Sequence, residues 1–313
     1  MPGSAPGQDD VFRILVFFFP LRRAARLAPG PGLIHDRRRK PEDGLSRKIA
    51  AALAATARMA TAVLRPYRRA VTLALLRERL GETVAVDTPA GPLRFHSPTA
   101  RSLHDTLRFE AGEPETIRWI DRLPAGSVLW DIGANVGVFA LYAARRGHRV
   151  LAFEPGAASF ATLVRNIEIN GLGDAVDGYC LALDEAGPAL GRLHMADTGA
   201  GHSWHSLDGL AAAGGAPAFR QAVPVCSVDH LVAAFGAPAP QHIKLDVDGL
   251  EERILRGART ALATSVRSLV VEINEAAPPG ASAIHRLLAP LGFVEDADPA
   301  VAVARNTVFR RAP

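Results

Sequence analysis

Short apolar segments alternate with amphipathic helical segments over most of the chain, and this alternation restricts the possible folds more than any other feature. The apolar segments predict strands at 128–131, 149–154, 176–183, 242–247, 268–274 and 301–310. Helical patterns separate them at 138–146, 157–170, 250–258 and 281–291. Strands joined by helices form a mostly parallel sheet that is covered on both faces. We therefore predict a doubly wound α/β domain, whose ligands bind at the carboxyl ends of the strands.

The N-terminal third has a different composition. Residues 1–48 show no sustained period and are predicted to be disordered, and an Ala/Leu/Arg-rich helical segment runs from about Ser46 to Leu80. Alternating residues around Pro-Ala-Gly-Pro predict a small hairpin cap at 83–98. The predicted organisation is an extension at 1–48, a helical lead-in and cap at 49–104, and the main domain at 105–313. A second interpretation is that the native chain starts at Met59.

Charge and cysteine content narrow the class of protein. Residues 1–80 hold sixteen Lys/Arg against six Asp/Glu, whereas the remainder holds twenty against twenty-six. An acidic main domain is poorly suited to a phosphate backbone, so we expect no nucleic-acid partner. Only Cys180 and Cys226 occur, which argues against a disulfide framework or zinc site and favours a cytoplasmic location. The apolar run at 11–20 is interrupted by Arg13 and too short to span a bilayer, so no stable membrane insertion is expected.

The most specific motif is Asp131-Ile-Gly-Ala-Asn-Val-Gly137, which lies between a predicted strand and a predicted helix. Gly133 and Gly137 allow a sharp turn and close approach of a ligand. Asp131 can pair with a ligand ammonium group, while the helix N-terminus offers N–H groups to a carboxylate. A ligand with an amino acid head suits both. The alternative is a dinucleotide site, but Asn135 and Val138 occupy positions where that motif needs glycine.

Residues at the ends of the next two strands predict the rest of a nucleoside site. Glu154 ends the second strand and precedes Pro155, so its carboxylate can accept hydrogen bonds from ribose hydroxyls. Leu181 and Ala182 end the third predicted strand and would lie over an adenine ring, although core packing explains them equally well. Asn170, followed by Gly171, is interpreted as the end of a helix.

The motifs together resemble a known family. DIGANVG, AFEP, RNIEINGL, IKLDVDGLEERILRGA and LVVEIN occur in this order, and over roughly residues 105–290 they are similar to the FkbM-type family of S-adenosylmethionine-dependent methyltransferases. The resemblance implies a class I methyltransferase (Rossmann-like) fold with S-adenosylmethionine as cofactor. It also implies O-methylation of sugars, polyketides or similar natural products.

The resemblance also assigns site residues. Those that match the family's cofactor-binding pattern by position are Asp131, Gly133, Asn135, Gly137 and Glu154, and we also expect Ala134 and Pro155 to contact the cofactor. Phe109 and Glu110, with Glu113 and Pro114 behind them, resemble the family's approach to the cofactor, although a helix N-terminus explains the last two equally well. The family commonly writes K-x-D-x-E-G where this chain has Asp248, whose shorter side chain puts a direct ligand contact in doubt.

Methyl transfer to a hydroxyl needs alignment and a group that accepts the proton. Asp246 ends the fourth predicted strand, and Lys244 shares its side of that strand. Either Asp246 orients or deprotonates the hydroxyl while Lys244 tunes its charge, or the two form a buried ion pair that holds the strand ends. Glu272 and Asp248 could join Asp246 around Mg²⁺, but no metal is predicted. We expect Asp248, Glu272 and Asn274 to contact the substrate.

The segment 201–206 (GHSWHS) places two histidines and a tryptophan in a predicted irregular insertion at 186–220. One interpretation is an exposed loop with incidental histidines. The other is a lid over the substrate, in which His202 or His205 acts as general base and Trp204 contacts the acceptor. Further along, Glu251, Glu252 and Arg256 are interpreted as a solvated helical face.

The predicted function is methyl transfer from S-adenosylmethionine to a hydroxyl on a sugar, glycolipid or secondary metabolite. The alternatives are N-methylation, an RNA target, a non-catalytic cofactor-binding protein on the same fold, and an NAD-binding oxidoreductase. The acceptor, the oligomeric state and the need for a metal do not follow from these patterns.

Overall fold

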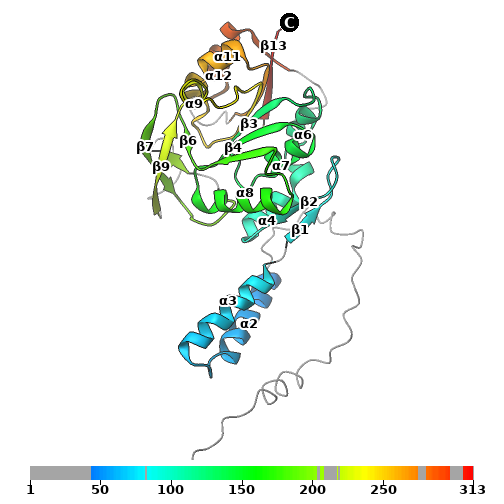
Figure 1. The fold of residues 1–313 in the computed structure, drawn as a ribbon, viewed down its shortest axis with the longest axis vertical. Coiled ribbons are helices and arrows are strands. Elements are labelled where there is room, and N and C mark those ends of the chain that lie inside the picture. Colours follow the sequence, from blue (N-terminus) through cyan, green and yellow to red (C-terminus); the bar gives the residue numbers. More distant parts are fainter. Residues whose placement is uncertain are drawn as a thin grey trace, which may run out of the picture. The chain divides into compact units, whose positions relative to one another are not determined.

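A large twisted sheet forms the centre of the protein in the computed structural model (Figure 1), which describes residues 44–81, 83–202, 205–207, 217, 219–273, 280–296 and 306–312. Its described strands lie in the order β12-β13-β11-β10-β3-β4-β5. Their bounds are β3 Val128–Ile132, β4 Arg149–Phe153, β5 Val176–Tyr179, β10 His242–Leu245, β11 Ser268–Glu272, β12 Phe293–Glu295 and β13 Asn306–Arg311. All neighbouring pairs from β5 to β11 are parallel, and β13 runs antiparallel to both of its neighbours.

Helices cover both faces of this sheet and bury two separate cores. On one face, Leu129, Val150 and Val270 pack with α6 (Pro114–Asp121), α7 (Val138–Arg145) and α8 (Ala157–Ile169). On the other, Trp130, Leu151 and Ile243 pack with α10 (Glu251–Arg256), α11 (Arg259–Thr264) and α12 (Gly280–Leu288). Successive residues of a strand point to opposite faces, so a strand buried on both sides reads as a continuous apolar run. The predicted doubly wound α/β fold is confirmed.

The predicted hairpin is also present, and two asparagines of α8 hold it. Strands β1 (Thr83–Val86) and β2 (Leu93–His96) pair antiparallel. Asn170 accepts a hydrogen bond from the backbone N–H of Arg94 and donates to the Arg94 carbonyl. Asn166 accepts from the His96 N–H at 2.7 Å and donates to the carbonyl of Val136 at 2.9 Å. The RNIEIN segment therefore connects the hairpin to the glycine loop, beyond the helix-ending role predicted for Asn170.

The prediction of an irregular insertion at 186–220 is corrected in part. A second sheet of four described strands, in the order β6-β9-β7-β8, includes residues 189–195, 206–207 and 219–220 of this region. Its strands are β6 Ala182–Leu183, β7 Ala189–Met195, β8 Ser206–Leu207 and β9 Phe219–Cys226. The third predicted strand is accordingly divided, because the chain leaves the main sheet after Tyr179 and joins the second sheet at Ala182. Alternate residues Leu193, Met195, Val223 and Val225 are buried in this sheet.

Several other elements depart from the predicted pattern. Helix α9 (Val228–Phe235) and strand β12 were not predicted, and short helices α4 (Ala100–Leu107) and α5 (Phe109–Gly112) precede α6. The segment predicted as a helix at 281–291 ends in a 3₁₀ turn, η1 (Ala289–Leu291). In α8, Val164 is exposed, whereas Leu163 and Ile167 are buried. Short elements carry too few turns for a hydrophobic period to be read.

Two helices precede the hairpin, α2 (Gly44–Ala60) and α3 (Pro66–Leu80). Pro66 in the first turn of α3 explains the break between them, because proline is favoured at a helix start and excluded from its interior. Helix α2 begins at Gly44, ahead of the predicted boundary at 49. Within the described ranges no helix is both long and apolar enough to cross a bilayer.

A buried histidine lies at the amino ends of the strands, at the edge opposite the predicted site. His242 Nδ1 lies 2.8 Å from Ser268 Oγ, which also accepts a hydrogen bond from Trp119 Nε1 at 2.9 Å. Burial is the main cause that lowers the pKa of His242 to about 4, and the nearby His148, Arg267 and Arg310 contribute to this shift. The folded state therefore favours the neutral imidazole.

Because the pKa of His242 is lowered in the folded state, we expect the protein to lose stability in mild acid. The folded-state pKa is below the unfolded value of about 6.5, so the contribution is complete above pH 6.5 and is lost as the pH falls toward 4. Between pH 7.5 and 5.0, wild type should lose about 2 kcal/mol of unfolding free energy relative to His242→Gln in urea denaturation. The comparison with the variant cancels the buried carboxylates, which titrate with the opposite sign. Parallel pH curves for the two proteins would contradict the assignment.

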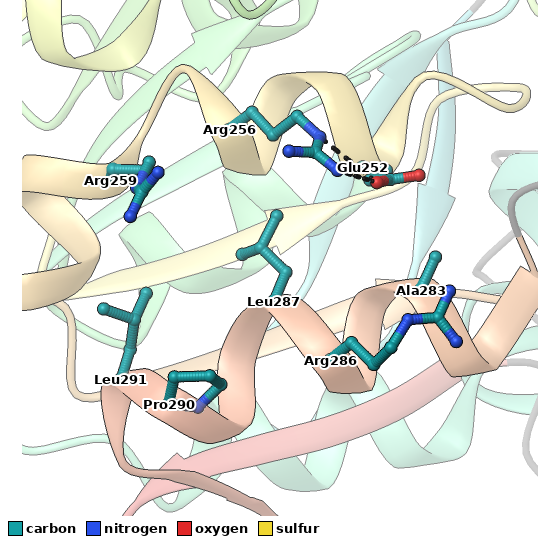
Figure 2. A pocket seen from close by; sticks show the side chains of 8 residues that line it. All are labelled: Glu252, Arg256, Arg259, Ala283, Arg286, Leu287, Pro290 and Leu291. Carbon is teal, nitrogen blue, oxygen red and sulfur yellow. Dashed lines mark hydrogen bonds and ion pairs between the residues drawn. The ribbon is translucent and has the colours of Figure 1, made fainter.

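The helices α10, α11 and α12 bound a surface groove of about 280 Å³ (Figure 2). Its lining combines apolar side chains of α12 and η1 with charged groups, namely Arg256, Arg259, Arg286 and Glu252. Figure 2 shows Arg256 turned toward Glu252 at one end, with Arg259 at the other. None of the predicted site residues lines this groove.

Candidate active site

The glycine loop between β3 and α7 adopts a strongly bent backbone. Gly133, Asn135 and Gly137 have φ angles of 84°, 51° and 91°, in the left-handed region. The N–H groups of Gly133 and Ala134 both donate to the Phe153 carbonyl at 3.0 Å. A Cβ atom on Gly133 would run into the backbone carbonyl of Asp246, so the loop passes directly against the end of β10. Glycine at 133 is therefore required both by the backbone angle and by the space.

Asp131 lies at the end of β3 with a carboxylate that is nearly fully buried. Among the described residues, neither of its oxygens has a hydrogen-bond partner, and the Lys244 Nζ is 4.0 Å from Oδ1. Burial raises the pKa of Asp131 to about 6, and the charge of Lys244 only partly offsets this. A buried carboxylate without hydrogen bonds is costly, and a ligand ammonium group would satisfy it.

Lys244 and Asp246 form an ion pair at the end of β10. Lys244 is opposite Asp131 in the parallel register of β10 and β3, which places both side chains on one side of the sheet. Its Nζ lies 2.9 Å from Asp246 Oδ2 and 4.9 Å from the centroid of the Phe139 ring. Burial by itself lowers the pKa of Lys244, but the carboxylates of Asp246, Glu113 and Asp131 raise it above its usual range. Lys244 therefore stays charged and is unsuited to act as a base.

Asp131, Lys244 and Asp246 differ in how far solvent can reach their side chains. The side chains of Asp131 and Lys244 are 1% and 3% exposed, whereas that of Asp246 is 30% exposed. Asp246 is thus the member that an acceptor can reach. Both roles considered for the pair, charge tuning and holding the strand ends, are compatible with this geometry.

Glu154, directly after β4, is held by backbone donors of the glycine loop and of its own turn. Its Oε2 accepts from the Asn135 N–H at 2.9 Å and its Oε1 from the Gly156 N–H at 2.7 Å. Burial raises the pKa of Glu154 to about 7, against the lowering effect of these bonds. Each carboxylate oxygen can accept a second hydrogen bond, so ribose hydroxyls can still bind here. Pro155 contributes its carbonyl, which accepts from Gln221 Nε2 in the second sheet.

Glu113, for which the sequence left open a helix start and a place in the approach to the cofactor, joins the Lys244 cluster. Its Oε2 accepts hydrogen bonds from Asn306 Nδ2 at 2.8 Å and Thr116 Oγ1 at 3.1 Å. Burial raises its pKa, Lys244 lowers it and Asp246 raises it again. The periodicity of the sequence carries no signal for this contact, since Asn306 lies in β13 at the far end of the chain.

The prediction that Glu251 belongs to a solvated helical face is wrong. Glu251 is buried, and its Oε1 accepts from the Gly249 N–H at 3.2 Å. Burial raises the pKa of Glu251 to about 7. Glu252 and Arg256 do form an ion pair with an exposed arginine, as predicted. The difference arises because Glu251 is the first residue of α10 and turns back under the loop that carries Asp246.

The histidines of the predicted lid lie in different environments. The backbone N–H of His205 donates to Asp248 Oδ2 at 3.3 Å. Burial lowers the pKa of the His205 ring. His202 lies beside Asp197, with Nε2 at 3.7 Å from Oδ1. The contact between His205 and Asp248 brings the second sheet to the loop after β10. A lid function and a base function for either histidine remain predictions.

The other predicted site residues lie in several different places, and some are outside the described residues. Glu272 ends β11 and is half-buried, Leu181 packs in the core beneath the main sheet, and Ala182 lies in the second sheet. Glu110 lies in α5, but its side chain is not described, and Trp204 and Asn274 fall outside the described residues. Across the described ranges, no group of three or more His, Cys, Asp or Glu side chains could hold a metal ion.

Comparison with known proteins places this site in a family. The Methyltransferase FkbM domain matches residues 131–295, more than half of the chain. Hexuronic acid methyltransferase AglP of Haloferax volcanii is 28% identical over 187 residues, which cover 58% of this chain and 71% of that protein. The 31-O-demethyl-FK506 methyltransferase FkbM of Streptomyces tacrolimicus is 29% identical over 176 residues, covering 49% and 67%. The crystal structure of Methyltransferase FkbM from Methylobacillus flagellatus KT is a distant match, with 16% identity, a TM-score of 0.38, and 78% and 59% coverage.

The doubly wound sheet and the acids at its edge define a class I S-adenosylmethionine-dependent methyltransferase. The chain belongs to the FkbM methyltransferase family. The cofactor fits the residues present, because the Asp131 carboxylate, which has no hydrogen-bond partner among the described residues, suits its ammonium group and Glu154 suits its ribose.

The raised carboxyl pKa values predict that cofactor binding releases protons. Asp131 and Glu154 must be ionised to bind an ammonium and hydroxyl donors, but their pKa values of about 6 and about 7 leave part of the population protonated near neutrality. Affinity for S-adenosylmethionine should therefore fall as the pH is lowered from 8 to 6. Calorimetry in buffers of different ionisation enthalpy measures the protons released.

Glu154→Ala is the matched variant for that experiment. It should weaken cofactor binding at least about tenfold, since it removes two charge-assisted hydrogen bonds and the ribose acceptor, and it should release fewer protons. Titration with NAD serves as the control ligand and should give no binding. Unchanged affinity for S-adenosylmethionine in Glu154→Ala would contradict the placement of the ribose.

Proposed function

We propose that this chain transfers the methyl group of S-adenosylmethionine to a hydroxyl oxygen of a sugar, glycolipid or secondary metabolite. The observation that carries the proposal is the position of Asp246, a partly exposed carboxylate held by a buried ammonium group beside the glycine loop. The names of two relatives, a hexuronic acid methyltransferase and a 31-O-demethyl-FK506 methyltransferase, support a hydroxyl-bearing small molecule.

The roles of the residues follow from their charges and access. When bound, the cofactor supplies an electrophilic methyl group on a sulfonium sulfur. Asp131 holds the amino acid end, Glu154 holds the ribose, and the bent loop from Gly133 to Gly137 lets both approach. Asp246 orients the acceptor hydroxyl and takes its proton, while Lys244 keeps Asp246 ionised and in place.

The acceptor contacts are proposed from the loops around Asp246. Asp248, Glu272, Trp204 and Asn274 are the candidate contacts, and His202 and His205 are candidates for a second proton acceptor. We further propose a cytoplasmic enzyme whose main domain spans residues 105–313, preceded by the helical lead-in and cap at 49–104 and the extension at 1–48.

Methyl-deuterated S-adenosylmethionine tests the reaction class directly. The full chain is incubated with a set of uronic acid glycosides, glycolipids and hydroxylated macrolides, each paired with an amino-substituted analogue. Mass spectrometry and NMR then locate the label. We expect a deuterated methyl ether, and label found only on nitrogen would exclude O-methylation.

A further inference from the structure

The helices α2 and α3 leave many large apolar side chains in contact with solvent. Neither helix buries a side chain in the part of the chain that the structure describes. Leu45, Ile49 and Leu53 of α2 are 65%, 51% and 66% exposed, and the other large exposed apolar residues of this segment are Met59, Val63, Tyr67, Val71, Leu75, Leu76 and Leu80. Apolar surface of this extent in a folded protein marks an interaction surface.

The α2 helix separates its apolar and basic side chains. Leu45, Ile49 and Leu53 are spaced by four residues and share one side of the helix, whereas Arg47 and Arg58 project from the other side. Lys48 is a third basic residue of α2, and further basic residues follow the helix at Arg65, Arg68, Arg69, Arg77 and Arg79. The only acidic residue between 44 and 81 is Glu78. The segment is therefore strongly positive as well as apolar.

We propose that α2 and α3 attach the enzyme to an anionic lipid surface, with α2 lying in the plane of the interface. Helices that lie in a bilayer interface carry apolar side chains on one side and Lys or Arg on the other. Basic residues near an anionic leaflet are attracted to its negative surface potential. A protein partner would need a surface that is both acidic and apolar along the whole segment. An anionic bilayer offers negative headgroups and apolar chains at every point of its surface.

Vesicle flotation of the full chain tests this attachment. The chain should float with vesicles of phosphatidylcholine mixed with phosphatidylglycerol, remain unbound with phosphatidylcholine alone, and detach as salt is raised. The triple change L45Q, I49Q and L53Q and the triple change K48Q, R58Q and R65Q should each weaken binding at least about tenfold. Circular dichroism and calorimetry with S-adenosylmethionine check that each variant remains folded.

A matched control uses exposed apolar residues of the main domain. V164Q, L190Q and V294Q together change three exposed apolar side chains outside the two helices and should leave flotation unchanged. Loss of binding in this control, or its survival in either helix variant, would overturn the proposal.

Three further outcomes would also overturn it. One is the absence of flotation with anionic vesicles. Another is a stable oligomer in sedimentation that L45Q, I49Q and L53Q dissociate, which would make a second copy of the chain the occupant of this surface. The last is a native protein whose intact mass shows a start at Met59, since α2 would then be missing.

Discussion

Asp246→Asn is expected to lower kcat at least about a hundredfold and to leave the Kd for S-adenosylmethionine within about threefold. Asparagine keeps the size of the side chain and an oxygen that accepts from Lys244 Nζ, so the pair that holds the end of β10 persists. What disappears is the negative charge on the member of the cluster that an acceptor can reach. The proposed cofactor contacts Asp131, in β3, and Glu154, directly after β4, are unchanged in this variant.

Asp248→Asn is the matched control for this prediction. It makes the same chemical change two residues further on, at a carboxylate that accepts the His205 N–H, and it should lower kcat less than about tenfold. Single-turnover rates measured with saturating cofactor separate the chemical step from binding. Full turnover in Asp246→Asn would leave Asp246 with the other role considered for it, that of holding the strand ends with Lys244.

Gly133→Ala should lower the unfolding free energy by about 3 kcal/mol and weaken cofactor binding at least about tenfold. Two effects add here. The φ of 84° is unfavourable for a residue with a Cβ atom, and that atom would also run into the Asp246 carbonyl. Relief of this contact moves either the loop that begins at Asp131 or the end of β10, and both belong to the site.

Gly147→Ala separates the two effects. Gly147 has a nearly identical φ of 88°, but no atom lies within 4 Å of where its Cβ would be. This variant should cost only about 1 kcal/mol in urea denaturation, from backbone strain alone, and should bind S-adenosylmethionine normally. Equal losses of stability in the two variants would show that the contact with Asp246 contributes nothing.

Local sequence patterns were sufficient for the central architecture and singled out several residues of the candidate site. Continuous apolar runs identify strands buried on both faces, and glycines between a strand and a helix identify a tight turn. Asp131, Gly133, Gly137 and Glu154 were predicted because each stands at a strand end or in a turn. The second sheet was missed because its strands are broken by glycine, alanine and proline, which are weak strand formers.

Local patterns alone predicted the parallel strands of the main sheet, the glycine loop and the acids at the ends of these strands, since these features depend on neighbours along the chain. The tertiary structure alone decided which charged and polar groups, distant in sequence, lie close enough to interact. Parallel register sets Lys244 beside Asp131, β13 brings Asn306 to Glu113, and the first turn of α10 buries Glu251. Electrostatic interactions act through space between residues that can be far apart in sequence, so the composition of such a cluster becomes visible only when the chain is folded.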